Sequence, residues 1–123
     1  MCDYSLEMYG SKPARQGERY MTTRFSTGTV GFASPGDRST PVCMQCDTRL
    51  RLEEIPKHLQ EKLGVGAVEE ATFVRLERGP FHDGVRFANG SEVTLQELQP
   101  GVTAIVTMQL ENMAPLTPVS AAV

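Results

Sequence analysis

Three cysteines and one histidine are the residues with the most specific chemistry in this chain. Cys43 and Cys46 form a C-x-x-C, a spacing at which two thiolates can reach the same metal ion. A closed structural zinc site takes four ligands, drawn from cysteine and histidine. The chain has three cysteines and two histidines, so four cysteines from one chain cannot form the site. We therefore predict a zinc site made of Cys2, Cys43, Cys46 and His82.

His82 is preferred as the fourth ligand because of its place in the sequence. It lies in Gly-Pro-Phe-His-Asp-Gly, a turn directly before a predicted strand, and loops between strands commonly carry sites. Asp83 could orient its ring. A second closed set would use Cys43 and Cys46 with both histidines, His58 and His82, and would leave out Cys2. His58 lies beside the polar face of a predicted helix.

Enzymatic alternatives use the same residues. If Met1 is removed, Cys2 becomes an N-terminal thiol whose α-amine could act as base, as in N-terminal nucleophile hydrolases. A dyad of Cys2 and His82, with Asp83 orienting the imidazole, is a second thiol option. A redox role for the C-x-x-C is less favoured, because such motifs open a helix in a βαβ pattern. Here the motif lies between β segments.

Charge and composition exclude several classes of protein. The net charge is −3, with +1 in residues 1–50 and −4 in residues 51–123, and neither part is a basic patch. This argues against nucleic acid as a partner. No apolar run is long enough for a transmembrane helix, and the N-terminus lacks the pattern of a secretory signal. We therefore expect a soluble cytoplasmic protein, in which three cysteines do not predict a disulfide framework.

The elements that would position these residues are mainly β. We predict a small barrel or strongly twisted antiparallel sheet of six to seven short strands, with one short helix at about 55–64. Asn89-Gly90 is the strongest hairpin signal. The expected domain spans 1–111, followed by a flexible tail at 112–123. The predicted strands are 18–25, 29–33, 48–53, 73–76, 84–88, 92–95 and 102–110, with the C-x-x-C in a loop or at a strand end.

The opening Met-Cys-Asp-Tyr-Ser-Leu resembles the start of a group of small bacterial proteins. The similarity continues in a Val-Cys at 42–43, a His-Asp before a strand, an Asn-Gly turn and the strand at 103–110. Cys46 does not belong clearly to this shared pattern. The resemblance implies a single domain and points to Cys2, Cys43 and His82, but it implies no activity.

The function predicted from these observations is that of a non-enzymatic binding or accessory module with a structural zinc ion. Its partner would be another protein or a second copy of the chain. No complete catalytic motif is present, which favours this hypothesis over the thiol- or metal-dependent enzyme based on Cys2 or His82. A third hypothesis is a subunit that is stable only in a larger complex, where an apolar strand face such as that of 102–110 would be covered.

Overall fold

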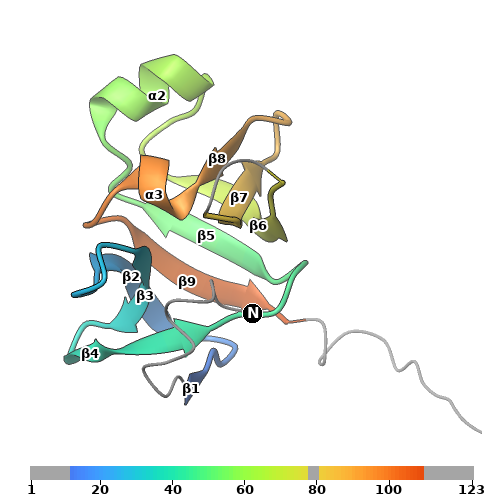
Figure 1. The fold of residues 1–123 in the computed structure, drawn as a ribbon. Coiled ribbons are helices and arrows are strands. Elements are labelled where there is room, and N and C mark those ends of the chain that lie inside the picture. The colour runs from blue at the N-terminus through green and yellow to red at the C-terminus, as the bar shows by residue number, and fades with distance from the viewer. Residues whose placement is uncertain (1–11, 78–80, 110–123) are drawn as a thin grey trace, which may run out of the picture.

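The computed structural model describes residues 12–77 and 81–109, which form a nine-stranded sheet and two short helices (Figure 1). The mainly β class is confirmed. The predicted numbers of strands, six to seven, and of helices, one, are lower than those in the structure. The division at 111 lies outside the described residues. The elements are β1 (Lys12–Pro13), β2 (Arg19–Arg24), β3 (Val30–Ser34), β4 (Asp37–Cys43), β5 (Arg49–Glu53), α2 (Lys57–Leu63), β6 (Glu69–Arg75), β7 (Asp83–Phe87), β8 (Glu92–Thr94), α3 (Leu95–Leu98) and β9 (Thr103–Met108).

The sheet consists of two groups of strands joined by the last one. Its order is β1-β4-β3-β2-β9-β5-β6-β7-β8, so β9 lies in the middle and pairs with both β2 and β5 (Figure 1). Neighbouring strands are antiparallel except for the short parallel pair of β1 and β4. In the first group, the neighbouring strands β2, β3 and β4 are also consecutive in sequence. In the second group, the same is true of β5, β6, β7 and β8. Strand β9 therefore holds together two groups of strands that are each local in sequence.

Alternation of apolar and charged side chains sets the faces of β5, as predicted. Leu50 and Leu52 are fully buried, whereas Arg49 and Arg51 are exposed. The predicted hairpin at Asn89-Gly90 also forms, with Val85 opposite Val93. The predicted extension of the second strand to Leu95 is wrong. Thr94 and Glu97 form a capping box that begins α3 at Leu95.

Strand β4 is the main element that the sequence did not predict. Its residues Asp37-Arg38-Ser39-Thr40-Pro41 are polar and include a proline, which is typical of a turn. The strand lies next to the edge of the sheet and is covered on its outer side only by the two residues of β1. Proline and charged residues are tolerated near sheet edges because backbone donors there need no partner strand.

The predicted helix at about 55–64 is confirmed as α2. Leu59 is buried, and Gly64 ends the helix in the left-handed region at φ 72°, where glycine is favoured. Pro56 precedes the first helical residue. In the part of the chain that the structure describes, no helix has the length and apolar character needed to cross a bilayer.

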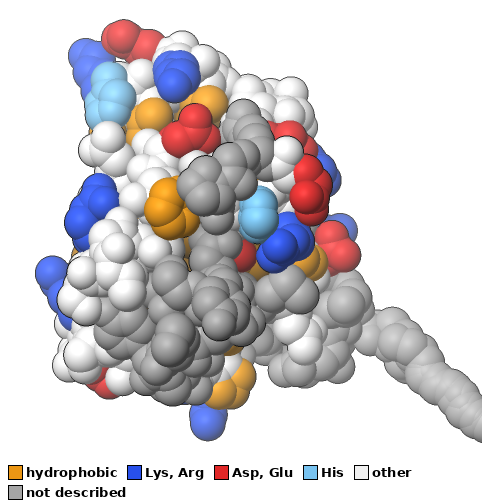
Figure 2. All heavy atoms as spheres, viewed as in Figure 1, with side chains coloured by type: hydrophobic (Ala, Val, Ile, Leu, Met, Phe, Trp, Pro, Cys, Tyr) orange, Lys and Arg blue, Asp and Glu red, His pale blue; other side chains and the backbone are white. Residues whose placement is uncertain are grey.

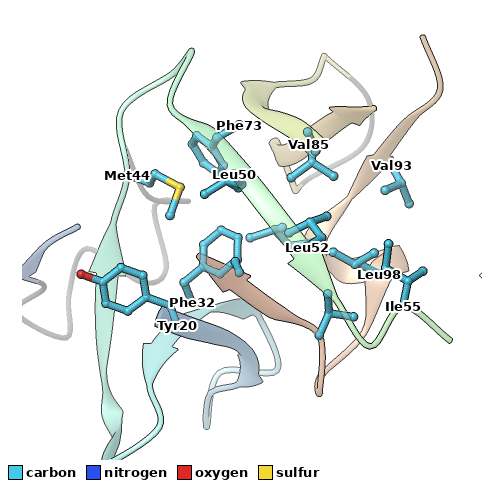
Figure 3. Close-up of a cluster of buried hydrophobic side chains, with 14 of the residues drawn as sticks. Tyr20, Phe32, Met44, Leu50, Leu52, Ile55, Phe73, Val85, Val93 and Leu98 are labelled. Atoms are coloured by element: carbon cyan, nitrogen blue, oxygen red, sulfur yellow. The ribbon is translucent and has the colours of Figure 1, made fainter. Parts of the chain in front are cut away.

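The hydrophobic core lies between the two groups of strands, on the concave face of the curved sheet. Phe32 of β3 and Phe73 of β6 meet there, with ring centroids 6.2 Å apart and planes inclined by 60° (Figure 3). Burial of such rings is a major source of stability in a domain of this size. The labelled side chains of this core are Tyr20, Phe32, Met44, Leu50, Leu52, Ile55, Phe73, Val85, Val93 and Leu98.

The prediction of a small barrel or a strongly twisted antiparallel sheet is confirmed only in part, because the sheet is open and β1 pairs with β4 in parallel. Its outermost strands, β1 and β8, have two and three residues and do not pair with each other. Helix α3 instead contacts β3 on one side and β7 and β8 on the other. The Gln96 amide accepts from the Val30 backbone N–H and donates to the Gly28 carbonyl, both at 2.9 Å. One side chain thus replaces part of a missing strand ladder.

We expect Gln96→Ala to lower the free energy of unfolding by about 2 kcal/mol, because it leaves the buried Val30 N–H without its acceptor. Urea denaturation would measure this change. Gln96→Glu keeps an acceptor for Val30 but loses the donor to Gly28, and should cost part of the same energy. Gln45→Ala, at an exposed position, is the control and should be neutral. Equal stability of Gln96→Ala and the wild type would contradict this bridging role.

Candidate functional site

Cys43 and Cys46 lie at the crossing between the two groups of strands. Cys43 is the last residue of β4, and Cys46 lies in the connection from β4 to β5. Both are half-buried, and Met44 between them is buried in the core. The C-x-x-C therefore begins on a strand and continues into a loop that is anchored by Met44, in agreement with the prediction of a strand end.

Backbone hydrogen bonds fix this loop against β6. The Asp47 N–H donates to the Phe73 carbonyl, and the Phe73 N–H donates to the Thr48 carbonyl, both at 2.8 Å. The Thr48 N–H closes a turn on the Gln45 carbonyl at 3.2 Å, with Asp47 at a φ of 75°. Cys46 is thus carried on a turn whose backbone is held by the second group of strands, while Cys43 belongs to the first.

A buried hydroxyl near this loop was not expected from the sequence. Thr48 is fully buried, and its Oγ1 has no hydrogen-bond partner among the described residues. A buried hydroxyl without a partner destabilises the folded state by about 1–3 kcal/mol. No signal in the sequence distinguishes this threonine from its neighbours, since it depends on the depth of the turn.

The oxidation state of the cysteines differs from the expectation of free thiols. Cys43 is disulfide-bonded, and Cys46 carries a free thiol. The third cysteine, Cys2, lies outside the described residues. Cys43 also packs against Phe25 and Ala33, which form a small apolar cluster apart from the main core. Because zinc binds thiolates, Cys43 can act as a ligand only when its disulfide is reduced.

His82 lies at the same end of the sheet as the C-x-x-C. Its carbonyl accepts from the Leu76 N–H at 2.7 Å, just beyond the end of β6, and the loop that carries Cys46 binds Phe73 on that strand. His82 and the loop that carries Cys46 are therefore both near the C-terminal end of β6. The assembly of Cys46 and His82 into one metal site stays a prediction.

The ring of His82 has a partner that the sequence analysis missed. Arg75 Nη2 lies 2.9 Å from His82 Nδ1. A guanidinium can only donate, so Nδ1 accepts and the proton of the neutral imidazole lies on Nε2. Neither nitrogen then offers a lone pair to a metal. For His82 to bind zinc, its ring has to release Arg75. The cross-strand register, Arg75 opposite Asp83, is what brings the arginine here.

Asp83 is the first residue of β7 and is almost completely buried, at 4% exposure. It faces Arg75 across the β6–β7 ladder. The role of Asp83 as a group that orients His82 stays a prediction. The position does hold a carboxylate, an imidazole and a guanidinium on adjoining residues, which gives this end of the sheet a polar character.

His58 lies at the opposite end of β5 from the C-x-x-C. It is exposed on α2, which follows β5, whereas Cys46 precedes that strand (Figure 1). The five residues of β5 span about 16 Å at about 3.3 Å per residue. A ligand set that joins His58 to Cys43 and Cys46 is therefore not assembled by this fold.

Within residues 12–77 and 81–109, no three His, Cys, Asp or Glu side chains are grouped so that they could hold a metal ion. Cys2, the third predicted thiolate, lies outside those ranges. Comparisons with protein-family models, with curated proteins and with solved structures found no match.

Proposed function

We propose that the chain is a non-enzymatic binding or accessory module in which reduced Cys43 and Cys46, with Cys2, hold a structural zinc ion. The observation that carries this proposal is the place of the C-x-x-C at the crossing from β4 to β5. A metal ion bound there would clamp the first group of strands to the second. Structural zinc contributes directly to folding free energy in this way.

A reducing cytoplasm would keep Cys43 as a thiol, the form that the metal needs. In this proposal His82 is the fourth ligand, and it takes that role only after its ring leaves Arg75. A solvent molecule or a group from a partner would otherwise complete the tetrahedron. The partner would be another protein or a second copy of the chain. Acidic and basic side chains are both present on the face in Figure 2, which supports a protein partner over nucleic acid.

Zinc titration of the reduced protein against a chelating dye tests this function. We expect Cys46→Ser to weaken zinc affinity at least about 100-fold, since it removes one thiolate of the site. His58→Ala is the matched control and should leave the affinity unchanged, because this residue is exposed at the far end of β5. Equal affinity of Cys46→Ser and wild type would exclude the site, and weakened binding in His58→Ala would contradict the placement of His58 far from the C-x-x-C.

A thiol-exchange protein is the second candidate, favoured by the disulfide at Cys43 beside the free thiol of Cys46. The Cys46 thiolate would attack Cys43 Sγ, form a Cys43–Cys46 bond and release the former partner sulfur as a thiolate. This step needs no added oxidant. Disulfide mapping by mass spectrometry distinguishes the two candidates. A Cys43–Cys46 bond in part of the oxidised protein would support exchange.

A further inference from the structure

A groove on the first group of strands is lined by two arginines. It has a volume of about 480 Å³ and lies between the end of β2, the start of β4 and the turn before β9. Arg24 and Arg38 are its charged groups, and Met21 and Pro100 are its apolar ones. Three further residues complete the lining: Thr22, Thr23 and Gly101. We call this region the arginine groove.

No carboxylate is among the residues that line the arginine groove. Both Arg24 and Arg38 are exposed. In the described part of the chain, neither of them forms an ion pair. By contrast, Arg19 and Arg51 both pair with Glu53. The groove therefore carries two uncompensated positive charges on a protein whose net charge is −3.

The nearest acidic side chain in sequence has other partners. The Asp37 carboxylate accepts from the Ser39 hydroxyl at 2.8 Å and from the Ser39 N–H at 3.2 Å. The hydrogen bond from the Ser39 side chain is the main reason that the pKa of Asp37 is lowered. On the other side, Arg24 is steadied by a bond of 2.9 Å from Nη1 to the Gly28 carbonyl. One guanidinium is thus partly preorganised, and the other is free to close on a ligand.

A second hollow differs from the arginine groove because carboxylates lie in or beside it. This one, of about 300 Å³, lies on the outer face of β5, β6 and β7 and is lined by Arg49, Glu70 and Arg86 among others. Arg86 is already held by Glu92, with its Nη2 and Nε at 2.8 and 2.9 Å from the same carboxylate oxygen. An anion there would meet the carboxylate of Glu70 and compete with that of Glu92. It is therefore a poor anion site.

We propose that the arginine groove binds a small organic oxyanion, a molecule with a carboxylate or phosphate group on a short apolar body. Guanidinium groups match both anions through paired N–H donors. Met21 and Pro100 provide the apolar contact. The volume falls within the range of small-molecule sites. Two arginines are too few for the extended phosphate contacts that hold a nucleic acid.

Titrations followed by amide chemical shifts test this proposal, with citrate and inorganic pyrophosphate as probes at low salt. We expect saturable shifts that centre on Met21, Thr23, Arg24 and Gly101 with at least one probe. The probe that binds more tightly identifies the group, carboxylate or phosphate. Arg24→Gln/Arg38→Gln should weaken that binding at least about tenfold, which is about 1.4 kcal/mol.

Arg49→Gln, in the second hollow, is the matched control and should leave the affinity unchanged. The proposal is overturned if neither probe gives saturable shifts up to about 10 mM, ten times a Kd of about 1 mM. It is also overturned if the double variant binds like the wild type, or if a single-stranded oligonucleotide binds the groove more tightly than both small anions. No cysteine or histidine lines the groove, so these outcomes do not depend on the zinc proposal.

Discussion

Gly84→Ala is expected to lower the free energy of unfolding by about 3 kcal/mol, and the melting temperature by about 10 °C. A Cβ added at Gly84 would lie 2.6 Å from the Val93 carbonyl oxygen and 2.6 Å from Leu76 Cδ1. The leucine could turn aside, but the carbonyl belongs to the paired strand β8 and cannot. Gly84 is buried between β6 and β8, so the clash has to move backbone.

Gly36→Ala is the matched control for this experiment. It lies in the turn before β4, where an added Cβ meets nothing within 4 Å and φ is not positive. We expect a change within about 0.5 kcal/mol. Thermal and urea denaturation of both variants would measure the contrast. A Gly84→Ala protein as stable as Gly36→Ala would mean that β7 and β8 do not lie as close as described.

Phe73→Ala is expected to cost about 3–5 kcal/mol, the range for removing a buried aromatic ring. The ring is 1% exposed and packs against Phe32 from the other group of strands. The same residue holds the loop that carries Cys46 through its backbone. Urea denaturation would measure the loss, and Phe73→Leu, which keeps most of the volume, should cost clearly less.

A double-mutant cycle with Phe32→Leu and Phe73→Leu tests whether the two groups of strands really face each other. We expect a coupling energy of about 0.5–1.5 kcal/mol for a tilted aromatic pair. A pair with no shared contact should be additive, and Phe73→Leu with Gly36→Ala provides that comparison. Coupling near zero between the two phenylalanines would contradict the arrangement of the core in Figure 3.

Local signals in the sequence were sufficient for much of the sheet. The alternation at Leu50 and Leu52, the Asn89-Gly90 turn and the helix that ends at Gly64 were each predicted from a few neighbouring residues and are present. These features depend on side-chain period and on turn chemistry, both of which are visible in a short window.

Features that depend on distant residues could not be predicted in the same way. Strand β4 has a polar sequence with Pro41, and its strand conformation follows from its partners β3 and β1. The link between α3 and the start of β3 depends on Gln96, whose amide contacts residues 66 and 68 positions away. Neither feature leaves a pattern in its own segment, because the reason lies in what packs against it.

In the candidate site too, some features could be predicted from a short stretch of sequence and others depend on distant residues. The residue types and the C-x-x-C spacing indicated thiolate chemistry, and the fold places Cys46 and His82 at one end of β6. The contact of Arg75 with His82 and the disulfide at Cys43 were not visible in the sequence. The first follows from the register of β6 and β7, which is set by pairing between strands.

Metal content is the most direct test of the structural zinc ion. Tag-free protein, purified under reducing conditions, would be analysed by elemental mass spectrometry beside Cys43→Ser/Cys46→Ser. The proposal predicts about one zinc per chain in the wild type and almost none in the variant, together with a lower melting temperature. Wild-type protein without zinc, or a variant that keeps the same amount, would contradict it.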